Sequence, residues 1–495
     1  MKKLVFSAGM EIIHIADTTM LYENEGNEVL YVMCDGCTGI CTSNLQRSKY
    51  KCKKCIIGTK QLAKHFSHNI KVEKLSSYDS IIDKSELDNL KFEYSDFTDV
   101  KKIKFHGVNV GYACVSTYIF KTRNLNPAID ENFRDFFNTL LKATCYLILL
   151  QEKIIDSFQP AEVTYFNGRF CENRTLLDLC LNRGIHTHAC DGVPVTNKKI
   201  LKNVFYDCLP QSMKNWEKVF EASWNNPLVP LHDKEQIGRW FFESKIHQRY
   251  TGDTNYVQGQ TFGAMPEGWD DNKTNYVIFN SSEDEYCSLD EEWDNAGVFD
   301  NQIEGIRYIC STLMQERPNI KLYLRIHPNL KNNKYKYHTI LHTLPSEYPN
   351  LTVIPGDSKI SSYSIMLNAD RVIVFGSTMG VEAAYANKVV INLAGIIYDS
   401  LKVCYYPQTV EAFRSMLLDD NLALLDNYNC LKYGYGVVKS DLPSYIYLSN
   451  DKKNKKERLA DIFLNSSILT SLHIHYINFL SKINSDGKAI PVKEA

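Results

Sequence analysis

The stretch ADRVIVFGSTMGVEAAYANKVVINLAG, residues 369–395, decides the fold. Residues 371–375 are a short β-branched apolar run, which is typical of a parallel strand covered on both faces. Residues 389–393 form a second run of the same kind, and the residues between them have helical spacing from about Gly380 onward. This order of strand, helix and strand predicts one unit of an open, parallel α/β sheet.

The turn after the first of these strands carries the residue types of an anion-binding site. Gly376 allows a sharp turn, and Ser377 or Thr378 can cap the helix. Free backbone N–H groups at a helix start attract negative charge, and two hydroxyls lie beside them. Glu382, in the first helical turn, is better placed to accept hydrogen bonds from sugar hydroxyls than to face a phosphate. The helical positions expected to face the sheet are Val381, Ala384 and Tyr385.

Another strand is predicted upstream, in the sequence KLYLRIHPN at 321–329. Pro328 ends it, so that Arg325 and His327 lie at its carboxyl end. Open α/β sheets bind their ligands at this end of the strands. A guanidinium and an imidazole there suit a phosphate or diphosphate group.

The motif R-x-H-P at 325–328, followed by S-T-x-G-x-E-A-A at 377–384, resembles the C-terminal donor-binding domain of GT-B glycosyltransferases, in particular the bacterial capsule and lipopolysaccharide biosynthesis group. The likeness extends over roughly residues 275–400. It implies an α/β fold with two Rossmann-like domains facing a cleft, and a metal-independent hexosyl or acid-sugar transferase. The donor would be a nucleotide sugar, and the acceptor a glycan or lipid-linked glycan. Related motifs occur in UDP-sugar 2-epimerases and CDP-polyol phosphotransferases, which are alternatives, as is a non-catalytic assembly protein.

The resemblance also implies roles for individual residues. Catalysis would need no metal cofactor, because cationic side chains and the helix start would neutralise the leaving phosphate. The implied donor-binding residues are Arg325, His327, Gly376, Ser377, Thr378, Gly380 and Glu382. Ser282, in the turn after the first predicted strand of this domain, is a further contact by position, whereas the acidic run that follows at 283–294 is expected to be a solvated loop.

Three segments of the first half place polar residues at strand ends along one edge of a sheet. Asn167 and Arg169 follow a strand that starts at residue 162, and Asp191 ends the next strand. Asp35 follows the strand at 27–33. Asp35 and Asp191 are therefore candidates for the base that deprotonates an acceptor hydroxyl, although strand-end aspartates also cap turns. Asn167 and Arg169 are candidate ligand contacts.

Length and composition limit the class of protein. The chain has 495 residues, enough for two domains, and a formal net charge of −2, which gives no general attraction to nucleic acid. We expect an acceptor-side domain at 1–255, a donor domain at 275–440 and a helical extension at 441–495. No signal peptide or membrane span is evident, which predicts a cytoplasmic protein. A basic stretch at 452–458 is either a solvated face or a contact with the inner face of the membrane.

Fifteen cysteines are present, and five of them lie close together in the sequence. Cys34, Cys37, Cys52 and Cys55 have a spacing near that of zinc ribbons, and Cys41 could replace Cys34. The alternatives are a structural zinc ion and a loop packed on reduced thiols. The basic, hydrophilic middle part of this insertion at 34–55 is typical of a knuckle, and a metal bound by four cysteines would be structural rather than catalytic.

The remaining pattern predicts secondary structure. A long amphipathic helix is expected at 132–158, a strand and loop at 108–119, and helices connecting the domains at 193–272. His186 and His188 alternate within a strand and are expected to be satisfied sheet residues rather than ligands.

Overall fold

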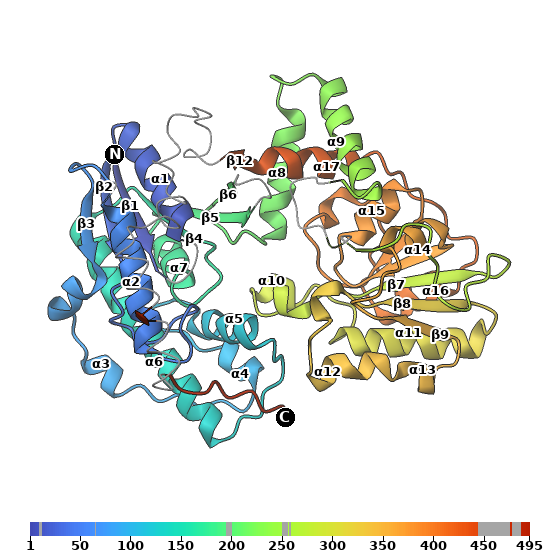
Figure 1. Ribbon diagram of the computed structural model, residues 1–495, viewed down its shortest axis with the longest axis horizontal. Helices are drawn as coiled ribbons and strands as arrows, with labels where there is room; N and C mark the ends of the chain where they lie inside the picture. Colours follow the sequence, from blue (N-terminus) through green and yellow to red (C-terminus); the bar gives the residue numbers. More distant parts are fainter. Residues whose placement is uncertain are drawn as a thin grey trace. The chain divides into compact units, whose positions relative to one another are not determined.

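The computed structural model describes residues 1–8, 12–64, 66–194, 200–249, 256, 259–443, 476–477 and 487–495. The chain divides into two compact units, one of Met1–Pro210 with Asp441–Ala495 and one of Gln211–Ser440 (Figure 1). Each unit has one β-sheet with helices on both faces. The predicted α/β class with two Rossmann-like units is confirmed, and the expected cleft stays a prediction.

The first unit is built on a seven-stranded sheet in the order β12-β6-β5-β4-β1-β2-β3. Strands β1 to β5 run parallel, and β6 and β12 are antiparallel to their neighbours. The strands are β1 Lys2–Ser7, β2 Glu28–Met33, β3 Lys71–Lys74, β4 Glu162–Phe166, β5 His186–Pro194, β6 Ile200–Tyr206 and β12 Asp441–Pro443. The main helices are α1 Ile12–Asn24, α2 Lys49–Ala63, α5 Val110–Thr122, α6 Glu131–Phe158 and α7 Arg174–Asn182.

Two expectations for this unit were wrong. The segment expected as strand and loop is helix α5, in which every residue from Val110 to Ile119 is buried, so its apolar residues lie on all sides and show no helical period. The segment after residue 193, expected to be helical, contains the antiparallel strand β6. The long helix α6 is confirmed, with Asp130 capping its first turn.

The second unit holds a five-stranded sheet in the order β11-β10-β7-β8-β9, with all neighbours parallel. Its strands are β7 Asn275–Phe279, β8 Lys321–Arg325, β9 Leu351–Ile354, β10 Arg371–Val374 and β11 Val389–Asn392. Helices α11 Gln302–Glu316 and α16 Val410–Leu418 cover one face and form the main apolar core with it. Helices α14 Ser362–Asn368 and α15 Met379–Tyr385 lie on the other face (Figure 1). The strand–helix–strand unit read from 369–395 is confirmed.

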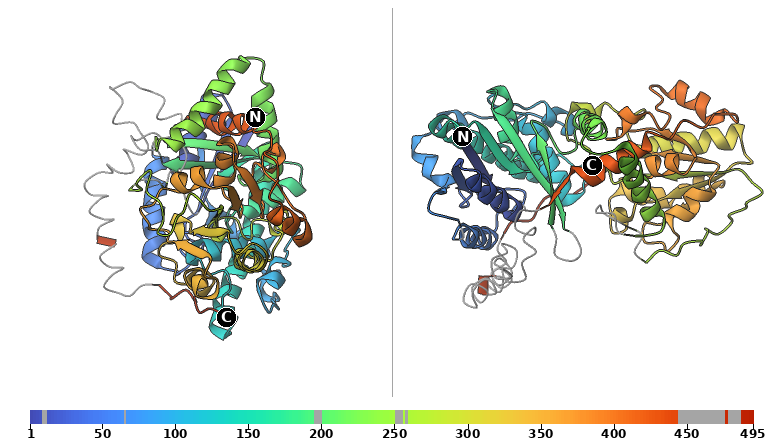
Figure 2. Two further views of the ribbon diagram at one scale, coloured as in Figure 1. Left: turned by 90° about the vertical axis from the view of Figure 1, so that its right-hand side faces the viewer. Right: turned by 90° about the horizontal axis from the view of Figure 1, so that it is seen from above.

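The second unit also contains the helices α8 Met213–Asn225, α9 Leu231–Ile246 and α17 Cys430–Ser440, and the short helices α10 Glu291–Asp294, α12 Lys336–Thr339 and α13 Leu344–Glu347. Figures 1 and 2 show α8 and α9 beside α17, and both helices contact it. The boundary expected near residue 255 therefore differs from the structural division at Pro210, because residues 211–246 pack within the second unit.

The C-terminal residues return to the first unit. Asp441–Pro443 is an edge strand rather than helix, and the rest of the expected extension, with the basic stretch at 452–458, lies almost wholly outside the described residues. Residues 491–495 lie along α5 and the segment that precedes α6, and the backbone N–H of Lys488 donates to the carbonyl of Gln46 at 2.6 Å. Tyr118 Oη donates to the carbonyl of Pro491 at 2.6 Å, and the backbone N–H of Ala128 donates to that of Lys493 at 2.7 Å.

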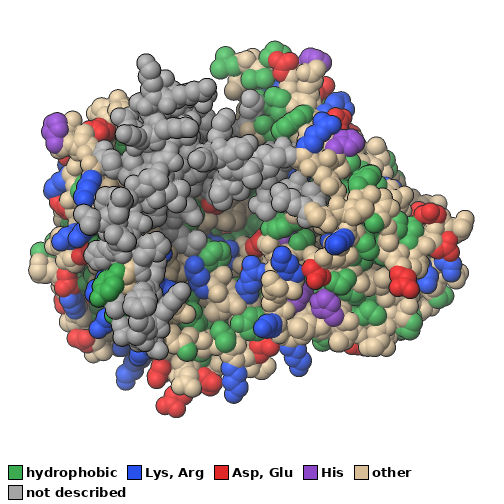
Figure 3. Space-filling model, in the orientation of Figure 1, with side chains coloured by type: hydrophobic (Ala, Val, Ile, Leu, Met, Phe, Trp, Pro, Cys, Tyr) green, Lys and Arg blue, Asp and Glu red, His purple; other side chains and the backbone are tan. Residues whose placement is uncertain are grey.

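No described helix has the length and apolar character needed to cross a membrane. On the face drawn in Figure 3, acidic and basic side chains of the described residues are interspersed. This mixture accords with the near-zero net charge of the sequence.

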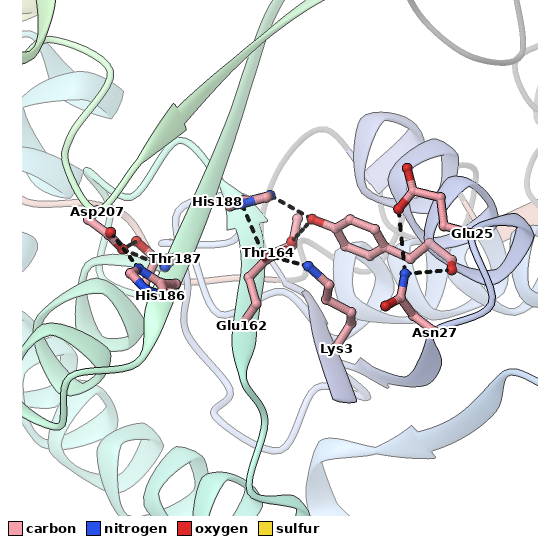
Figure 4. Close-up of polar contacts among 10 residues, drawn as sticks. Lys3, Glu25, Asn27, Glu162, Thr164, His186, Thr187, His188 and Asp207 are labelled. Carbon is pink, nitrogen blue, oxygen red and sulfur yellow. Dashed lines mark hydrogen bonds and ion pairs between the residues drawn. The ribbon is translucent and has the colours of Figure 1, made fainter. Parts of the chain in front are cut away.

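A polar network on the sheet of the first unit accounts for His188 (Figure 4). His188 Nδ1 lies 2.7 Å from the hydroxyl of Tyr22, and Nε2 lies 3.1 Å from Glu162 Oε2. Lys3 Nζ contacts the same carboxylate oxygen at 2.5 Å. His186 pairs with Asp207 at 2.9 Å. Both histidines are satisfied within the sheet, as expected.

This network predicts an acid-sensitive contribution to stability. Burial opposes ionisation, but hydrogen bonds from His188 and Lys3 lower the pKa of Glu162 to about 2. Because the unfolded value is about 4.3, the stabilisation is complete above that pH and is lost as the pH falls toward 2. Urea unfolding should show that the stability difference between wild type and Glu162→Gln shrinks from about pH 5 to about pH 3. A difference that stays constant over this range would contradict the assignment.

Candidate functional site

A pocket of about 100 Å³ lies at the carboxyl ends of β7 and β8, within the second unit. Helices α9, α14 and α15 supply the rest of its wall. Its polar lining residues are Lys245, Tyr256, Gln260, Asn280, Arg325, His327, Ser362, Tyr363, Ser377, Thr378 and Glu382. The two predicted motifs, one at the end of β8 and one at the start of α15, are thus brought together at the sheet edge where ligands bind in this architecture.

Arg325, the last residue of β8, is 1% exposed and organises the pocket wall. Its guanidinium donates to the carbonyls of Pro355 and Ser358 and lies 3.4 Å from Ser362 Oγ. Burial lowers its pKa to about 10, so it remains charged at neutral pH. Arg325 therefore fixes the loop after β9 and supplies positive charge to the pocket.

His327 is held at the pocket rim from both sides. Its backbone N–H donates to Asn280 Oδ1 at 2.8 Å, and its Nδ1 accepts from the N–H of Asn329 at 3.3 Å. The ring lies edge to face with Tyr256, with centroids 5.1 Å apart. The Nδ1 atom of His327 therefore faces the backbone N–H of Asn329.

Glu382 lies at the inner end of the pocket and is 3% exposed. Lys245 Nζ contacts its Oε1 at 2.9 Å, and Tyr363 Oη donates to its Oε2 at 2.6 Å. Both oxygens already have partners, so hydroxyl groups of a ligand would share the carboxylate with Lys245 and Tyr363.

The turn before α15 is held by a side-chain cap and by two close contacts of the glycine backbone. Ser377 Oγ accepts from the N–H of Met379 at 3.3 Å, so Ser377, and not the N-cap residue Thr378, caps the helix by its side chain. Gly376 has φ of 63°, and a Cβ there would lie 2.7 Å from the carbonyl oxygen of Gly395. A Cβ at Gly380 would lie 2.3 Å from the Tyr398 hydroxyl. Both glycines are needed for close packing and neither lines the pocket.

No protein-family model and no curated protein matches the sequence. Among solved structures, the β-Kdo 2,4-transferase KpsC of Thermosulfurimonas dismutans shares 12% identity, with 55% of this chain and 78% of that chain covered and a TM-score of 0.34. The UDP-GlcNAc 2-epimerase of Neisseria meningitidis shares 13% identity, with 89% and 98% covered and a TM-score of 0.32. The glycotransferase of kitacinnamycin shares 9% identity, with 88% and 94% covered and a TM-score of 0.24. At these values none of them transfers a residue role to this chain.

The candidates of the first unit are only partly brought together. Asn167 Nδ2 donates to Asp191 Oδ2 at 3.1 Å, so these two share the predicted sheet edge. Arg169 is 4% exposed, and its Nε donates to Ser116 Oγ at 2.5 Å, so its side chain is held inside the first unit, and its contact with a ligand stays a prediction. Asp35 accepts from the backbone N–H and the hydroxyl of Ser76 and so holds the turn after β3.

The loop after β7 differs from its expectation. Ser282 is 1% exposed and donates to Asp284 Oδ1 at 2.5 Å, away from the pocket lining. Asp284 is itself buried, and burial raises the pKa of Glu283, which accepts from the backbone N–H of Gln302. The start of the acidic run is therefore a packed corner, because its carboxylates find hydrogen-bond donors within the loop and at α11.

The five clustered cysteines, Cys34, Cys37, Cys41, Cys52 and Cys55, are free thiols of intermediate burial. Among the described residues, which include all five of these cysteines, no group of three His, Cys, Asp or Glu side chains is placed to hold a metal ion. Cys52 and Cys55 lie in helix α2 rather than in a knuckle. Burial raises the pKa of Cys37 to about 12, with Asp35 adding to the effect, so that thiol is protonated at neutral pH. A structural zinc ion at these cysteines therefore stays a prediction.

Six polar pocket residues were not identified from the sequence as ligand contacts, namely Lys245, Tyr256, Gln260, Asn280, Ser362 and Tyr363. Tyr363 and Lys245 are helical positions without a motif, and Asn280 was one residue of a polar turn. Gln260 comes from the segment expected to connect the domains, and its Oε1 accepts from the N–H of Ser362 at 3.1 Å, capping α14 where Ser361 does not. Only the approach of distant segments reveals these residues, and a single sequence carries no signal of that approach.

Proposed function

We propose that this chain is a glycosyltransferase that moves a hexose or acid sugar from a nucleotide-sugar donor to a growing surface polysaccharide or lipid-linked glycan. The proposal rests on one observation. Three cationic or ionisable groups, Lys245, Arg325 and His327, and three hydroxyls, of Ser362, Ser377 and Thr378, line one pocket at the carboxyl end of a parallel sheet.

Such a pocket suits the leaving group of glycosyl transfer. When the bond from the anomeric carbon to phosphate breaks, negative charge grows on the phosphate oxygens, and preorganised cations and hydroxyl donors stabilise it. Arg325 is fixed by its hydrogen bonds and charged at neutral pH, so little reorganisation is needed. His327 at the rim would contact the phosphate directly, by the ring nitrogen that does not face Asn329.

A transferase that inverts the anomeric centre also needs a base for the acceptor hydroxyl. Asp191, paired with Asn167, is the candidate that we propose. Asp35 is the weaker one, because Ser76 already uses both its carboxylate oxygens. Acceptor binding and contact with the inner face of the membrane belong to the same proposal.

The direct test is a thermal-shift series with CMP, CDP, UDP, GDP and dTDP on wild type and on His327→Ala. A nucleotide at 100 times its dissociation constant should stabilise the wild type by about 2.7 kcal/mol. We expect one nucleotide to raise the Tm of the wild type and to have little effect on His327→Ala. His342→Ala, an exposed histidine of the same unit outside the pocket, is the matched control and should respond like the wild type.

Two outcomes would contradict this proposal. No response to any nucleotide would remove the support for a nucleotide-sugar donor. Conversion of a nucleotide sugar to its epimer in the absence of acceptor would show that the same pocket serves an epimerase.

A further inference from the structure

Helix α9 precedes the five-stranded sheet in sequence. It makes two side-chain contacts with α15, and one of them involves the pocket residues Lys245 and Glu382. Phe242 stacks on Tyr385 with ring centroids 4.4 Å apart and planes 13° apart. Lys245 pairs with Glu382 at 2.9 Å. The two contacts are three residues apart on each helix, so one face of α9 lies along one face of α15. Tyr385, expected to face the sheet, belongs to this helix contact instead.

A close helix crossing fixes α9 in this position. A Cβ at Gly238 would lie 2.6 Å from the carbonyl oxygen of Leu431 in α17, and a Cβ at Gly434 would lie 2.8 Å from the carbonyl oxygen of Gly238. The backbones of α9 and α17 therefore touch, which only glycine permits. Lys245 lies two turns further along α9, so this crossing determines where its ammonium group lies.

We infer that Lys245 is a phosphate-binding residue of the pocket, delivered by α9, and that Glu382 holds its ammonium group until an anionic ligand enters. This inference rests on the proposed function and names a further residue of the same site. Lys245 is 5% exposed and lines the pocket. Arg325 already donates to two carbonyls, so Lys245 would add a charge-assisted hydrogen bond for a ligand with several negative oxygens. Glu382 keeps the hydrogen bond from Tyr363 when Lys245 turns to the ligand.

The same helix supplies a matched control. Lys234 is also buried, at 4% exposed, and its Nζ donates to the carbonyls of Trp224 and Asn226. It does not line the pocket. Loss of either lysine removes a buried charge from α9, but only loss of Lys245 removes one from the pocket.

The experiment is calorimetric titration of the full chain with inorganic pyrophosphate. Lys245→Met should weaken binding by about tenfold or more, the typical effect of losing a charge-assisted hydrogen bond. Lys245→Arg should restore most of the affinity because it keeps the charge. Lys234→Met should lower the Tm but change the affinity by less than about twofold. Glu382→Gln should bind pyrophosphate as tightly as wild type or more tightly, since the competing carboxylate charge is gone.

The double variant Lys245→Met/Glu382→Gln leaves no unpaired buried charge, so it protects the test against misfolding of the single variant. It should bind as weakly as Lys245→Met. Wild-type affinity in Lys245→Met, or an equal loss in Glu382→Gln, would overturn the inference and leave the ion pair a structural one. Absence of pyrophosphate binding by the wild type at millimolar concentration would also overturn it. Binding of pyrophosphate without binding of any nucleotide would instead contradict the proposed function alone.

Discussion

Replacing Arg325 by methionine is expected to abolish nucleotide binding and to lower the free energy of unfolding of the second unit by about 3 kcal/mol. The guanidinium is almost completely buried and donates to the carbonyls of Pro355 and Ser358. Methionine fills a similar volume but leaves those carbonyls without a donor, and each unsatisfied buried group costs about 1–3 kcal/mol. The loop after β9 and the N-terminus of α14 should lose their fixed position.

Urea unfolding measures the stability, and calorimetric titration with the nucleotide that stabilises the wild type measures the binding. Arg325→Lys keeps the charge but lacks the planar fork that reaches two carbonyls, so it should recover only part of either property. Arg307→Met is the control, because Arg307 is a partly exposed arginine of the same unit that pairs with Glu347. A stable Arg325→Met protein with wild-type affinity would show that the pocket is organised by other residues.

Replacing Gly238 by alanine should separate α9 from α17 and cost about 2 kcal/mol, the usual effect of overpacking a close contact. The added methyl group would meet the backbone of Leu431, which cannot rotate away as a side chain can. The shift of α9 should move Lys245 away from Glu382, so pyrophosphate affinity should fall together with stability.

Thermal unfolding and titration of Gly238→Ala, compared with Gln236→Ala, test this expectation. Gln236 is exposed on the same helix, so its replacement by alanine controls for the change in helix propensity. Lower stability with unchanged affinity would mean that Lys245 is positioned by its contact with α15 and not by the helix crossing.

The sequence predicts best those strands whose residue types reflect their burial and their position in the sheet. The apolar run at 371–374 and the basic strand end at Arg325 and His327 could be placed because buried parallel strands and their carboxyl ends have distinct residue types. Helix α5 could not be recognised, because a helix buried on all sides has no polar face and therefore no period.

The candidate site shows the same limit at the level of single residues. His327, Ser377 and Glu382 were identified because they sit in a strand–turn–helix pattern. Lys245 comes from a helix outside that pattern, and only tertiary packing brings it within 2.9 Å of Glu382. Ser282 was expected to contact the ligand because it follows a strand end. In the structure its hydroxyl donates to Asp284, a contact that its position in the sequence does not reveal.

The chain leaves the first unit after Pro210 and returns to it at Asp441, so the second unit is one uninterrupted segment of sequence. Its first and last helices, α8 and α17, pack against each other. Every residue that lines the pocket, from Lys245 to Glu382, is encoded within that segment. The second unit is thus inserted between two segments of the first, and all the residues that line its pocket are encoded in one continuous stretch of the gene.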